Sequence, residues 1–238
     1  MKRAIIFGAS SGIGREMAAI LSGKGYALGL AARRVELLEA LKRELPNASY
    51  VRFCDIADAD ACEQVFSGFI RDLGGLDLVV ISSGTGYIND DLEWQKEKET
   101  IDVNVSGFAR VAGLAARYFI SSAGGHIVGI SSIGGLRGGR EAPAYSASKA
   151  FVSNYMEGLR CRMKRMNARV TVTDIMPGFV DTDMAKGDGL FWVAPAEEAA
   201  RQICRAIEKK KERAYITKRW ALIALLMKWM PDWLYCRL

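Results

Sequence analysis

Short apolar runs rich in β-forming residues alternate along the chain with longer stretches in which apolar positions recur at helical spacing. The run at residues 3–10 leads into a helical pattern at 14–25, and the run at 26–33 leads into another at 35–45. Further apolar runs, with helical patterns between most of them, lie at 49–56, 76–84, 125–132 and 170–178. This alternation predicts strands connected by helices.

Strands that are apolar throughout are typical of a parallel sheet with helices on both faces. We therefore predict an α/β fold with a doubly wound, Rossmann-type parallel sheet in a single domain. Ligands of such sheets bind beyond the carboxyl ends of the strands, near the switch point of the strand order. The motifs that carry chemistry in this chain all fall at those ends.

The first predicted strand runs into GASSGIG, a glycine-rich turn at the start of the first helix. Such a tight turn needs glycine for its backbone angles and for close approach of a phosphate, which the N–H groups of the helix attract. The spacing G-x-x-x-G-x-G differs from the commoner G-x-G-x-x-G, and the alternative is a connection without function. We expect a dinucleotide to contact Gly8, Ser10, Ser11, Gly12, Ile13 and Gly14.

The end of the second predicted strand indicates which nucleotide binds. It carries Arg33 and Arg34 and no acidic residue. An acid would accept hydrogen bonds from the ribose hydroxyls of NAD, whereas arginine suits the 2′-phosphate of NADP. The cofactor is therefore predicted to be NADP(H), and the alternative is a solvated basic turn. We expect Asp55 and Ile56 to frame the adenine, and Gly84 to let the backbone approach the cofactor.

Composition narrows the class of protein. Half of the 238 residues are apolar and 25% are charged, as in a soluble chain with a proper core. Five scattered cysteines without a C-x-x-C pair indicate free thiols in a reducing, cytoplasmic setting. The only histidine, His126, excludes a multi-histidine metal site and is expected to be structural; no metal is predicted. The N-terminal apolar run is too short for a secretory signal and is interpreted as the first strand.

The net charge of +6 is concentrated near the C-terminus. Residues 201–238 hold ten Lys/Arg and three Asp/Glu, so the first 200 residues carry 23 basic and 24 acidic groups. A nucleic-acid-binding protein would spread its basic groups over a face of the fold. The charge pattern therefore argues against a nucleic-acid partner.

The sequence APAYSASKA places Tyr145 one helical turn before Lys149, with only small residues between them. Together with the other motifs, this pair resembles the short-chain dehydrogenase/reductase family over nearly the whole chain, from Lys2 to about Tyr215. The matching positions occur in the family's order: Gly8, Gly12, Ile13, Gly14, Asp55, Asn104, Ser132, Tyr145, Lys149, Pro177 and Gly178.

The resemblance implies a catalytic role for four of these residues. Tyr145 would protonate a carbonyl oxygen as hydride arrives from the nicotinamide, and would act as the base in reverse. Lys149 would lower the pKa of Tyr145 and hold the nicotinamide ribose. Ser132 would hydrogen-bond the substrate oxygen, with Ser131 as the alternative. Asn104 would hold a water that links Lys149 to solvent, unless it only bridges backbone groups.

The resemblance also implies further contacts and an assembly. Pro177, Gly178 and Thr182 would join Tyr145 and Lys149 in cofactor binding. Helices from about residues 102 and 145 form subunit interfaces in relatives, which predicts a homodimer or homotetramer. The fourth strand ends in Ile-Ser-Ser-Gly at 81–84, where the family often has Asn-Asn-Ala-Gly, and this departure puts sheet stabilisation at that point in doubt.

We therefore predict an NADP(H)-dependent oxidoreductase that transfers hydride between the nicotinamide and an apolar carbonyl or alcohol substrate. The apolar residues Met184, Leu190, Phe191 and Trp192 precede a helix expected near Pro195, and they are expected to close over the substrate, with buried core as the alternative. Two other functions remain open: a 3-oxoacyl-thioester reductase of lipid synthesis, and a non-catalytic NADP-sensing protein. Arg137 and Arg140 are either solvated or meet an anionic group of the substrate.

The division predicted from sequence is a catalytic domain at 1–218 and an apolar, basic tail at 219–238. The tail is apolar nearly all round from Trp220 to Met230 and too short before Pro231 to cross a bilayer, which takes about 20 apolar residues. Its tryptophans and flanking basic residues suit peripheral contact with an anionic membrane. Packing against a partner subunit is the alternative.

Overall fold

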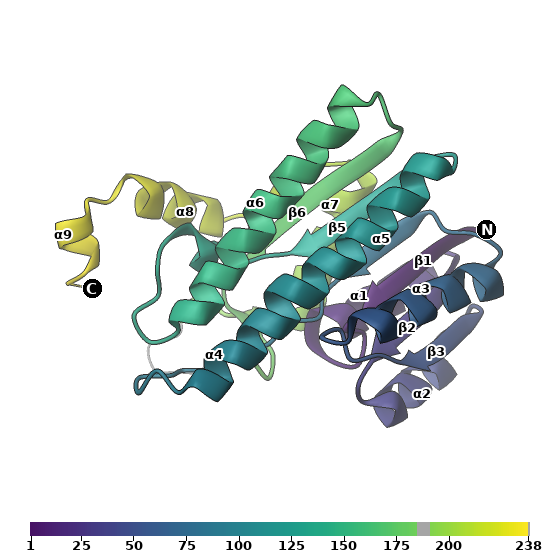
Figure 1. The fold of residues 1–238 in the computed structure, drawn as a ribbon, viewed down its shortest axis with the longest axis horizontal. Coiled ribbons are helices and arrows are strands. Elements are labelled where there is room, and N and C mark those ends of the chain that lie inside the picture. Colours follow the sequence, from purple (N-terminus) through teal and green to yellow (C-terminus); the bar gives the residue numbers. More distant parts are fainter. Residues whose placement is uncertain (185–190, 238) are drawn as a thin grey trace.

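Seven parallel strands form the central sheet of the computed structural model, which describes residues 1–184 and 191–237 (Figure 1). The strand order is β3-β2-β1-β4-β5-β6-β9, which confirms the predicted doubly wound α/β fold. The strands are β1 (Lys2–Phe7), β2 (Tyr26–Ala32), β3 (Ser49–Phe53), β4 (Leu78–Ile81), β5 (Gly125–Ile130), β6 (Val170–Pro177) and β9 (Arg213–Ile216). The order reverses between β1 and β4, which places the switch point there.

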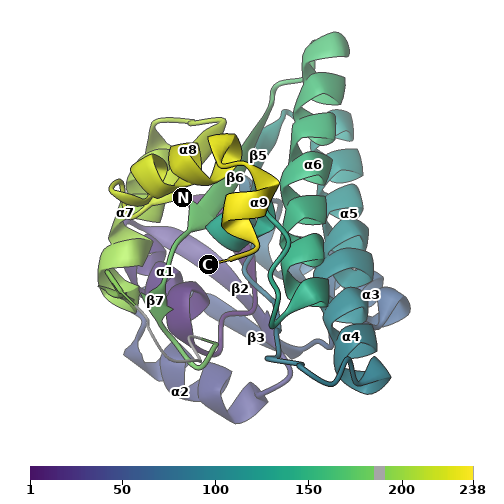
Figure 2. The same ribbon diagram turned by 90° about the vertical axis from the view of Figure 1, so that its left-hand side faces the viewer.

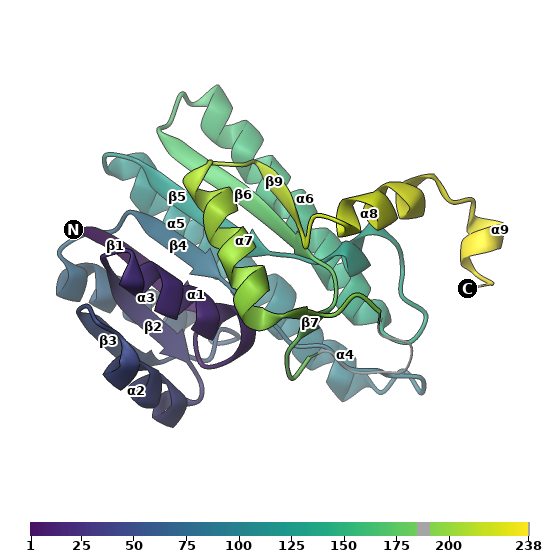
Figure 3. The same ribbon diagram turned by 180° about the vertical axis from the view of Figure 1, so that it is seen from behind.

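Helices cover both faces of the sheet (Figures 1 and 3). On one face lie α1 (Gly12–Gly23), α2 (Val35–Glu44) and α7 (Ala196–Glu208); on the other lie α3 (Ala59–Leu73), α5 (Phe108–Ser121) and α6 (Pro143–Arg165). Neighbouring residues of β1 pack into the cores on opposite faces of the sheet. Ile6 packs with the first set of helices, and Ile5 and Phe7 pack with the second. Both faces of β1 are therefore buried, as its unbroken apolar run predicts.

Two short helical turns follow α4 (Trp94–Ile101) and β5. Helix α4 continues through a π-helical turn, η1 (Asp102–Gly107), into α5. A 3-10 turn, η2 (Ile133–Leu136), follows β5 directly. The strands β7 (Val180–Asp181) and β8 (Ala194–Pro195) pair outside the main sheet and hold the two ends of the segment that contains the residues not described.

The C-terminal helices project beyond the sheet (Figures 1 and 3) and face the viewer in Figure 2. They are α8 (Trp220–Trp229) and α9 (Asp232–Tyr235). Trp220 is almost completely buried and packs with Ile133 and Met176 in a small third core. The first turn of α8 therefore packs against the rest of the fold. Among the described residues, no helix is long and apolar enough to cross a membrane.

Candidate functional site at the carboxyl edge of the sheet

The glycine turn after β1 fits against β4 with no room for side chains. Gly8 and Gly12 have φ of 85° and 53°, angles that favour glycine. A Cβ on Gly8 would lie 2.4 Å from the Ser83 nitrogen, and one on Gly14 would lie 2.1 Å from the Gly8 oxygen. The turn therefore brings the start of α1 close to the switch point. The Ser11 side chain does not cap α1, and the first turn has no acidic residue, so its positive end is available to an anion.

The two arginines after β2 have different partners. Arg34 donates from Nη2 to the hydroxyls of Ser10 at 3.2 Å and Ser11 at 2.6 Å, and its Nη1 lies 3.7 Å from Asp183. Arg33 instead lies 3.7 Å from Glu99, at the end of α4. Of the two, Arg34 is the arginine at the glycine turn.

The other residues expected at the cofactor lie along the same edge. Ile56 is buried, and the Asp55 carboxylate accepts a hydrogen bond from the Ala57 nitrogen at 3.0 Å, which fixes the turn after β3. The Thr182 methyl would lie 2.9 Å from a Cβ on Gly12, so Thr182 packs on the glycine turn. The edge thus collects residues that follow β1, β2, β3 and β7.

Tyr145 and Lys149 lie in the first turns of α6, beside the end of β5. The Lys149 ammonium donates to the Ile130 carbonyl at 3.1 Å and lies 5.7 Å from the centre of the Tyr145 ring. A Cβ on Gly134 would contact both Ser132 Oγ at 3.4 Å and the Tyr145 ring at 3.6 Å. The structure therefore brings Ser132, Tyr145 and Lys149 close together.

Burial moves the pKa values of the pair in opposite directions. It lowers the pKa of Lys149 to about 8, and the buried Asp174 carboxylate opposes that shift. It raises the pKa of Tyr145, and a hydrogen bond with Ser132 opposes the rise. Loss of solvation therefore dominates the pKa of Tyr145, and its lowering by Lys149, which the resemblance implies, stays a prediction.

The structure separates the two neighbouring serines. Ser131 is buried and donates to Asp174 at 2.5 Å, in the strand next to its own. Ser132 is partly exposed, and its Oγ accepts from the Gly134 nitrogen at 3.0 Å. Ser131 is thus committed to the sheet, and Ser132 is the serine that faces Tyr145.

Asn104 is hydrogen-bonded to the loop after β4 and to α6. The residue is buried in η1; its Oδ1 accepts from the Thr85 nitrogen at 2.9 Å, and its Nδ2 donates to the Thr85 carbonyl at 2.7 Å and to Ser148 Oγ at 2.9 Å. With these partners the amide fixes residues 84–86 against α6. A Cβ on Gly84 would lie 3.2 Å from Lys149 Nζ and 3.3 Å from Asn104 Oδ1, so the three groups are neighbours.

The end of β6 contacts the start of α8 through aromatic rings. A Cβ on Gly178 would lie 2.1 Å from the Trp220 indole, so this glycine is needed for packing within the protein. Phe179 and Phe191 lie 5.4 and 5.0 Å from Trp220 between ring centres, and Trp192 lies 5.9 Å away. Phe191 and Trp192 nevertheless remain exposed in part. Leu190 lies outside the described residues, and Met184 is exposed.

Two residues near the site escaped the sequence prediction, and a third has partners other than those expected. Gly86 has no space for a Cβ, which would lie 2.5 Å from the Tyr145 ring. Asp174 is fully buried, yet in the sequence it lies unmarked within an apolar strand. Arg137, thought to be solvated or to face the substrate, donates to the backbone carbonyls of Met227 and Met230 in the C-terminal tail. The signal for Gly86 was present as a second glycine after β4, whereas the other two depend on tertiary contacts.

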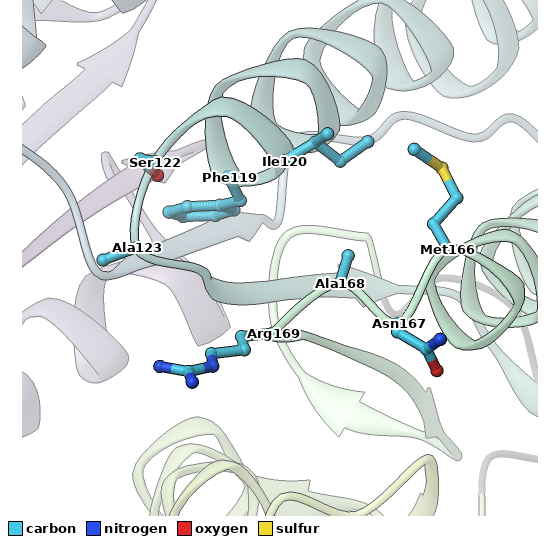
Figure 4. A pocket seen from close by; sticks show the side chains of 8 residues that line it. All are labelled: Phe119, Ile120, Ser122, Ala123, Met166, Asn167, Ala168 and Arg169. Atoms are coloured by element: carbon cyan, nitrogen blue, oxygen red, sulfur yellow. The ribbon is translucent and has the colours of Figure 1, made fainter.

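The pocket drawn in Figure 4 is unrelated to this edge. It lies between the ends of α5 and α6, at the amino ends of β5 and β6, and Arg169 is the charged residue among those that line it. The parallel strands run from this pocket toward Ser132 and Tyr145. The candidate catalytic residues thus lie at the opposite end of the sheet.

The fold and its switch-point turn define an α/β protein of the Rossmann type. A protein-family model described as short chain dehydrogenase matches residues 2–190. An uncharacterized oxidoreductase of Myxococcus xanthus (strain DK1622) is 37% identical over 188 residues, which cover 77% of this chain and 74% of the relative. The chain belongs to the short-chain dehydrogenase/reductase family and is an oxidoreductase acting on CH–OH groups with NAD(P).

Two further comparisons extend this likeness. A protein of Homo sapiens named 3-oxoacyl-[acyl-carrier-protein] reductase is 33% identical over 186 residues, which cover 76% of each chain. The crystal structure of a short-chain type dehydrogenase/reductase from Mycobacterium marinum has a TM-score of 0.83 at 22% identity, covering 92% of this chain and 95% of that one. At that identity the structural match supports the fold alone.

Proposed function

We propose that this protein is an NADP(H)-dependent oxidoreductase that reduces an apolar ketone or aldehyde, or oxidises the corresponding alcohol. The observation that carries the proposal is the grouping of Ser132, Tyr145 and Lys149 around Gly134 and Gly84. A hydroxyl donor, a phenol and a buried cation at one point suit a carbonyl oxygen that must gain a proton. The apolar character of the substrate rests on Phe191 and Trp192 beside this edge.

In the proposed mechanism, Ser132 and Tyr145 hold the substrate oxygen by hydrogen bonds. Tyr145 transfers its phenolic proton to that oxygen in reduction and takes it back in oxidation. Lys149 stabilises the phenolate that forms, because its charge lies close in a poorly solvated place. Asn104 acts as a positioning residue, since its amide fixes the loop beside Lys149.

The residues present fit a nicotinamide dinucleotide, which supplies or accepts the hydride when bound. The uncapped start of α1 suits its pyrophosphate. Gly8, Gly12 and Gly14 permit close approach of the backbone, with Ile13, Asp55, Ile56, Gly84, Pro177, Gly178 and Thr182 proposed as further contacts along the same edge. Among the groups at this turn, Arg34 with Ser10 and Ser11 suits a 2′-phosphate best.

The test of cofactor choice is a fluorescence titration of the purified protein with NADPH and NADH. We expect NADPH to bind more tightly, and Arg34→Asp to remove that preference because it places a carboxylate at the phosphate position. Arg33→Asp is the matched control, because Arg33 lies toward Glu99, and it should reduce the preference less. Equal binding of both nucleotides by the unaltered protein would contradict the NADP assignment.

A second candidate is reduction of a 3-oxoacyl thioester. The human relative carries that name, and the aromatic segment near 191 suits an acyl chain. A non-catalytic NADP sensor is the less supported alternative, because Ser132, Tyr145 and Lys149 are all present and close together. Comparing the turnover of a 3-oxoacyl thioester with that of simple apolar ketones distinguishes the two enzymatic functions.

We also propose a homodimer or homotetramer in a reducing, cytoplasmic setting. The stacked rings of Phe151 and Tyr155 on α6, 5.5 Å apart and partly exposed, support contact through this helix. The five cysteines are free thiols, in keeping with a reducing compartment. Light scattering of the purified protein measures the assembly.

A further inference from the structure

Apolar side chains of the C-terminal helices form one exposed stripe. Its members are spaced i, i+3, i+4, i+7 and i+11, which places those within α8 on one face of that helix. Leu222, Trp229 and Trp233 are 70%, 80% and 65% exposed. The opposite face of α8, with Trp220 and Ala224, is buried against the protein. We define the tail stripe as Leu222, Leu225, Leu226, Trp229 and Trp233.

The protein holds this stripe in place by specific contacts. Arg137 donates to the carbonyls of Met227 at 3.0 Å and Met230 at 2.7 Å, and forms an ion pair with Asp232 at 2.7 Å. The same guanidinium lies 4.3 Å from the ring centre of Tyr235, whose hydroxyl donates to the Gly138 carbonyl at 2.8 Å. The exposed apolar face is therefore a built feature of the folded chain.

The charges around the stripe are suited to an anionic partner. Four cations flank it, at Lys218, Arg219, Lys228 and Arg237, while Asp232 is the acid of the segment and is paired with Arg137. Two such tails facing each other across a twofold axis would bring like charges together, which disfavours a second copy as the partner. Tryptophan and leucine with flanking basic residues are the composition of helices that lie in a membrane interface.

We propose that the tail stripe docks this protein onto an anionic lipid bilayer, with α8 lying in the headgroup region. The Leu and Trp side chains enter the boundary of the acyl chains, and the flanking cations contact the lipid phosphates.

The docked stripe lies next to the candidate active site. Arg137 and Gly138, which anchor the tail, lie in the connection between Ser132 and α6. At the base of the stripe, Arg219 donates to the Trp192 carbonyl at 2.8 Å and lies 5.2 Å from its ring centre. Resting on the proposed function, this geometry assigns the substrate to carbonyl compounds or alcohols with a long apolar chain that partition into the bilayer.

The test is flotation of the full chain with vesicles of phosphatidylcholine, alone or with phosphatidylglycerol. We expect binding to the anionic vesicles that weakens with added salt, and a loss of about tenfold or more in Trp229→Ser/Trp233→Ser. Trp94→Ser is the matched control, because Trp94 is 68% exposed on α4, far along the chain from the tail; it should float like the unaltered protein. A second variant, Lys228→Glu/Arg237→Glu, should lose the preference for anionic vesicles.

Two results would overturn the docking proposal. One is equal flotation of the unaltered and Trp229→Ser/Trp233→Ser proteins, or no flotation of either. The other is a smaller molecular mass of Trp229→Ser/Trp233→Ser than of the unaltered protein in light scattering, together with no vesicle binding by the unaltered protein. That result would make the tail stripe a subunit contact.

NADPH binding and turnover of a water-soluble ketone without vesicles test the proposed function separately, and the stripe variants should leave both unchanged. The KM for a long-chain ketone carried in anionic vesicles should rise in Trp229→Ser/Trp233→Ser alone.

Discussion

At the scale of single residues, Lys149 is the group whose environment most affects the proposed chemistry. Burial lowers its pKa to about 8 from an ordinary 10.5, while the charge of Asp174 holds it up. In the proposed mechanism, its ammonium stabilises the phenolate of Tyr145. Proton transfer should therefore weaken as the pH rises through about 8 and Lys149 becomes neutral.

Asp174→Asn should move this upper pH limit of kcat to lower pH. Removing the carboxylate removes the negative charge that raises the pKa of Lys149, so the lysine loses its proton at lower pH. Ser131→Ala is the control, because it removes the hydrogen bond to Asp174 without changing any charge. The measurement is the pH profile of kcat for all three proteins; an unshifted limit in Asp174→Asn would count against the role given to Lys149.

His126 predicts an acid limit to stability. Burial lowers its pKa to about 4, below the ordinary 6.5, and its Nε2 lies 2.7 Å from Thr173 Oγ1. The unfolded chain thus takes up a proton at higher pH than the folded one, and stability falls as the pH drops from about 6.5 to about 4. The whole loss is about 3 kcal/mol.

Denaturant unfolding between pH 7 and 4 checks this expectation. His126→Gln keeps a polar group beside Thr173 but does not titrate, so its free energy of unfolding should fall less over this range. The same pH dependence in the variant would assign the acid limit to other groups.

At the scale of elements, Trp220 at the start of α8 packs against the segment that follows β6. Its indole fills the space that the absent side chain of Gly178 leaves, and Phe179 and Phe191 pack around it. Phe179 and Phe191, beside the candidate substrate site, therefore depend on α8 for their position.

Trp220→Ala should lower the free energy of unfolding by about 3–5 kcal/mol, because it leaves a large cavity in a packed core. It should also raise the KM for an apolar substrate more than it lowers kcat, since Phe191 loses its support. Trp229→Ala is the matched control: that side chain is exposed, and its loss should change stability by about 0.5 kcal/mol or less. Similar unfolding curves for the two variants would contradict the packing role of Trp220.

At the scale of the whole molecule, the sequence predicts the strands, which its apolar runs mark, and the turn after β1, which its glycines mark. The apolar runs mark β1, β2, β4, β5 and β6 because both faces of these strands are buried. Gly8, Gly12 and Gly14 mark the turn because a Cβ does not fit at two of them. Strand β9 was not predicted: its four residues, RAYI, are too short a run to stand out.

Side-chain partners were harder to predict than elements. Which of Arg33 and Arg34 faces the glycine turn depends on the direction of each side chain, and the sequence does not give it. Arg137 finds its partners about 90 residues away, in the tail. Asn104 was predicted as a site residue, but its hydrogen bonds to Thr85 exist only once the loop after β4 has folded against η1.

The most direct test of the central claim compares the unaltered protein with Tyr145→Phe. Both are mixed with NADPH and a series of apolar ketones, and NADPH oxidation is followed together with NADPH binding. Loss of the phenolic proton should lower kcat by about 10² to 10⁴-fold while NADPH still binds, because the ring and its packing against Gly86 remain. Turnover by Tyr145→Phe at the rate of the unaltered protein would show that Tyr145 is not the proton donor.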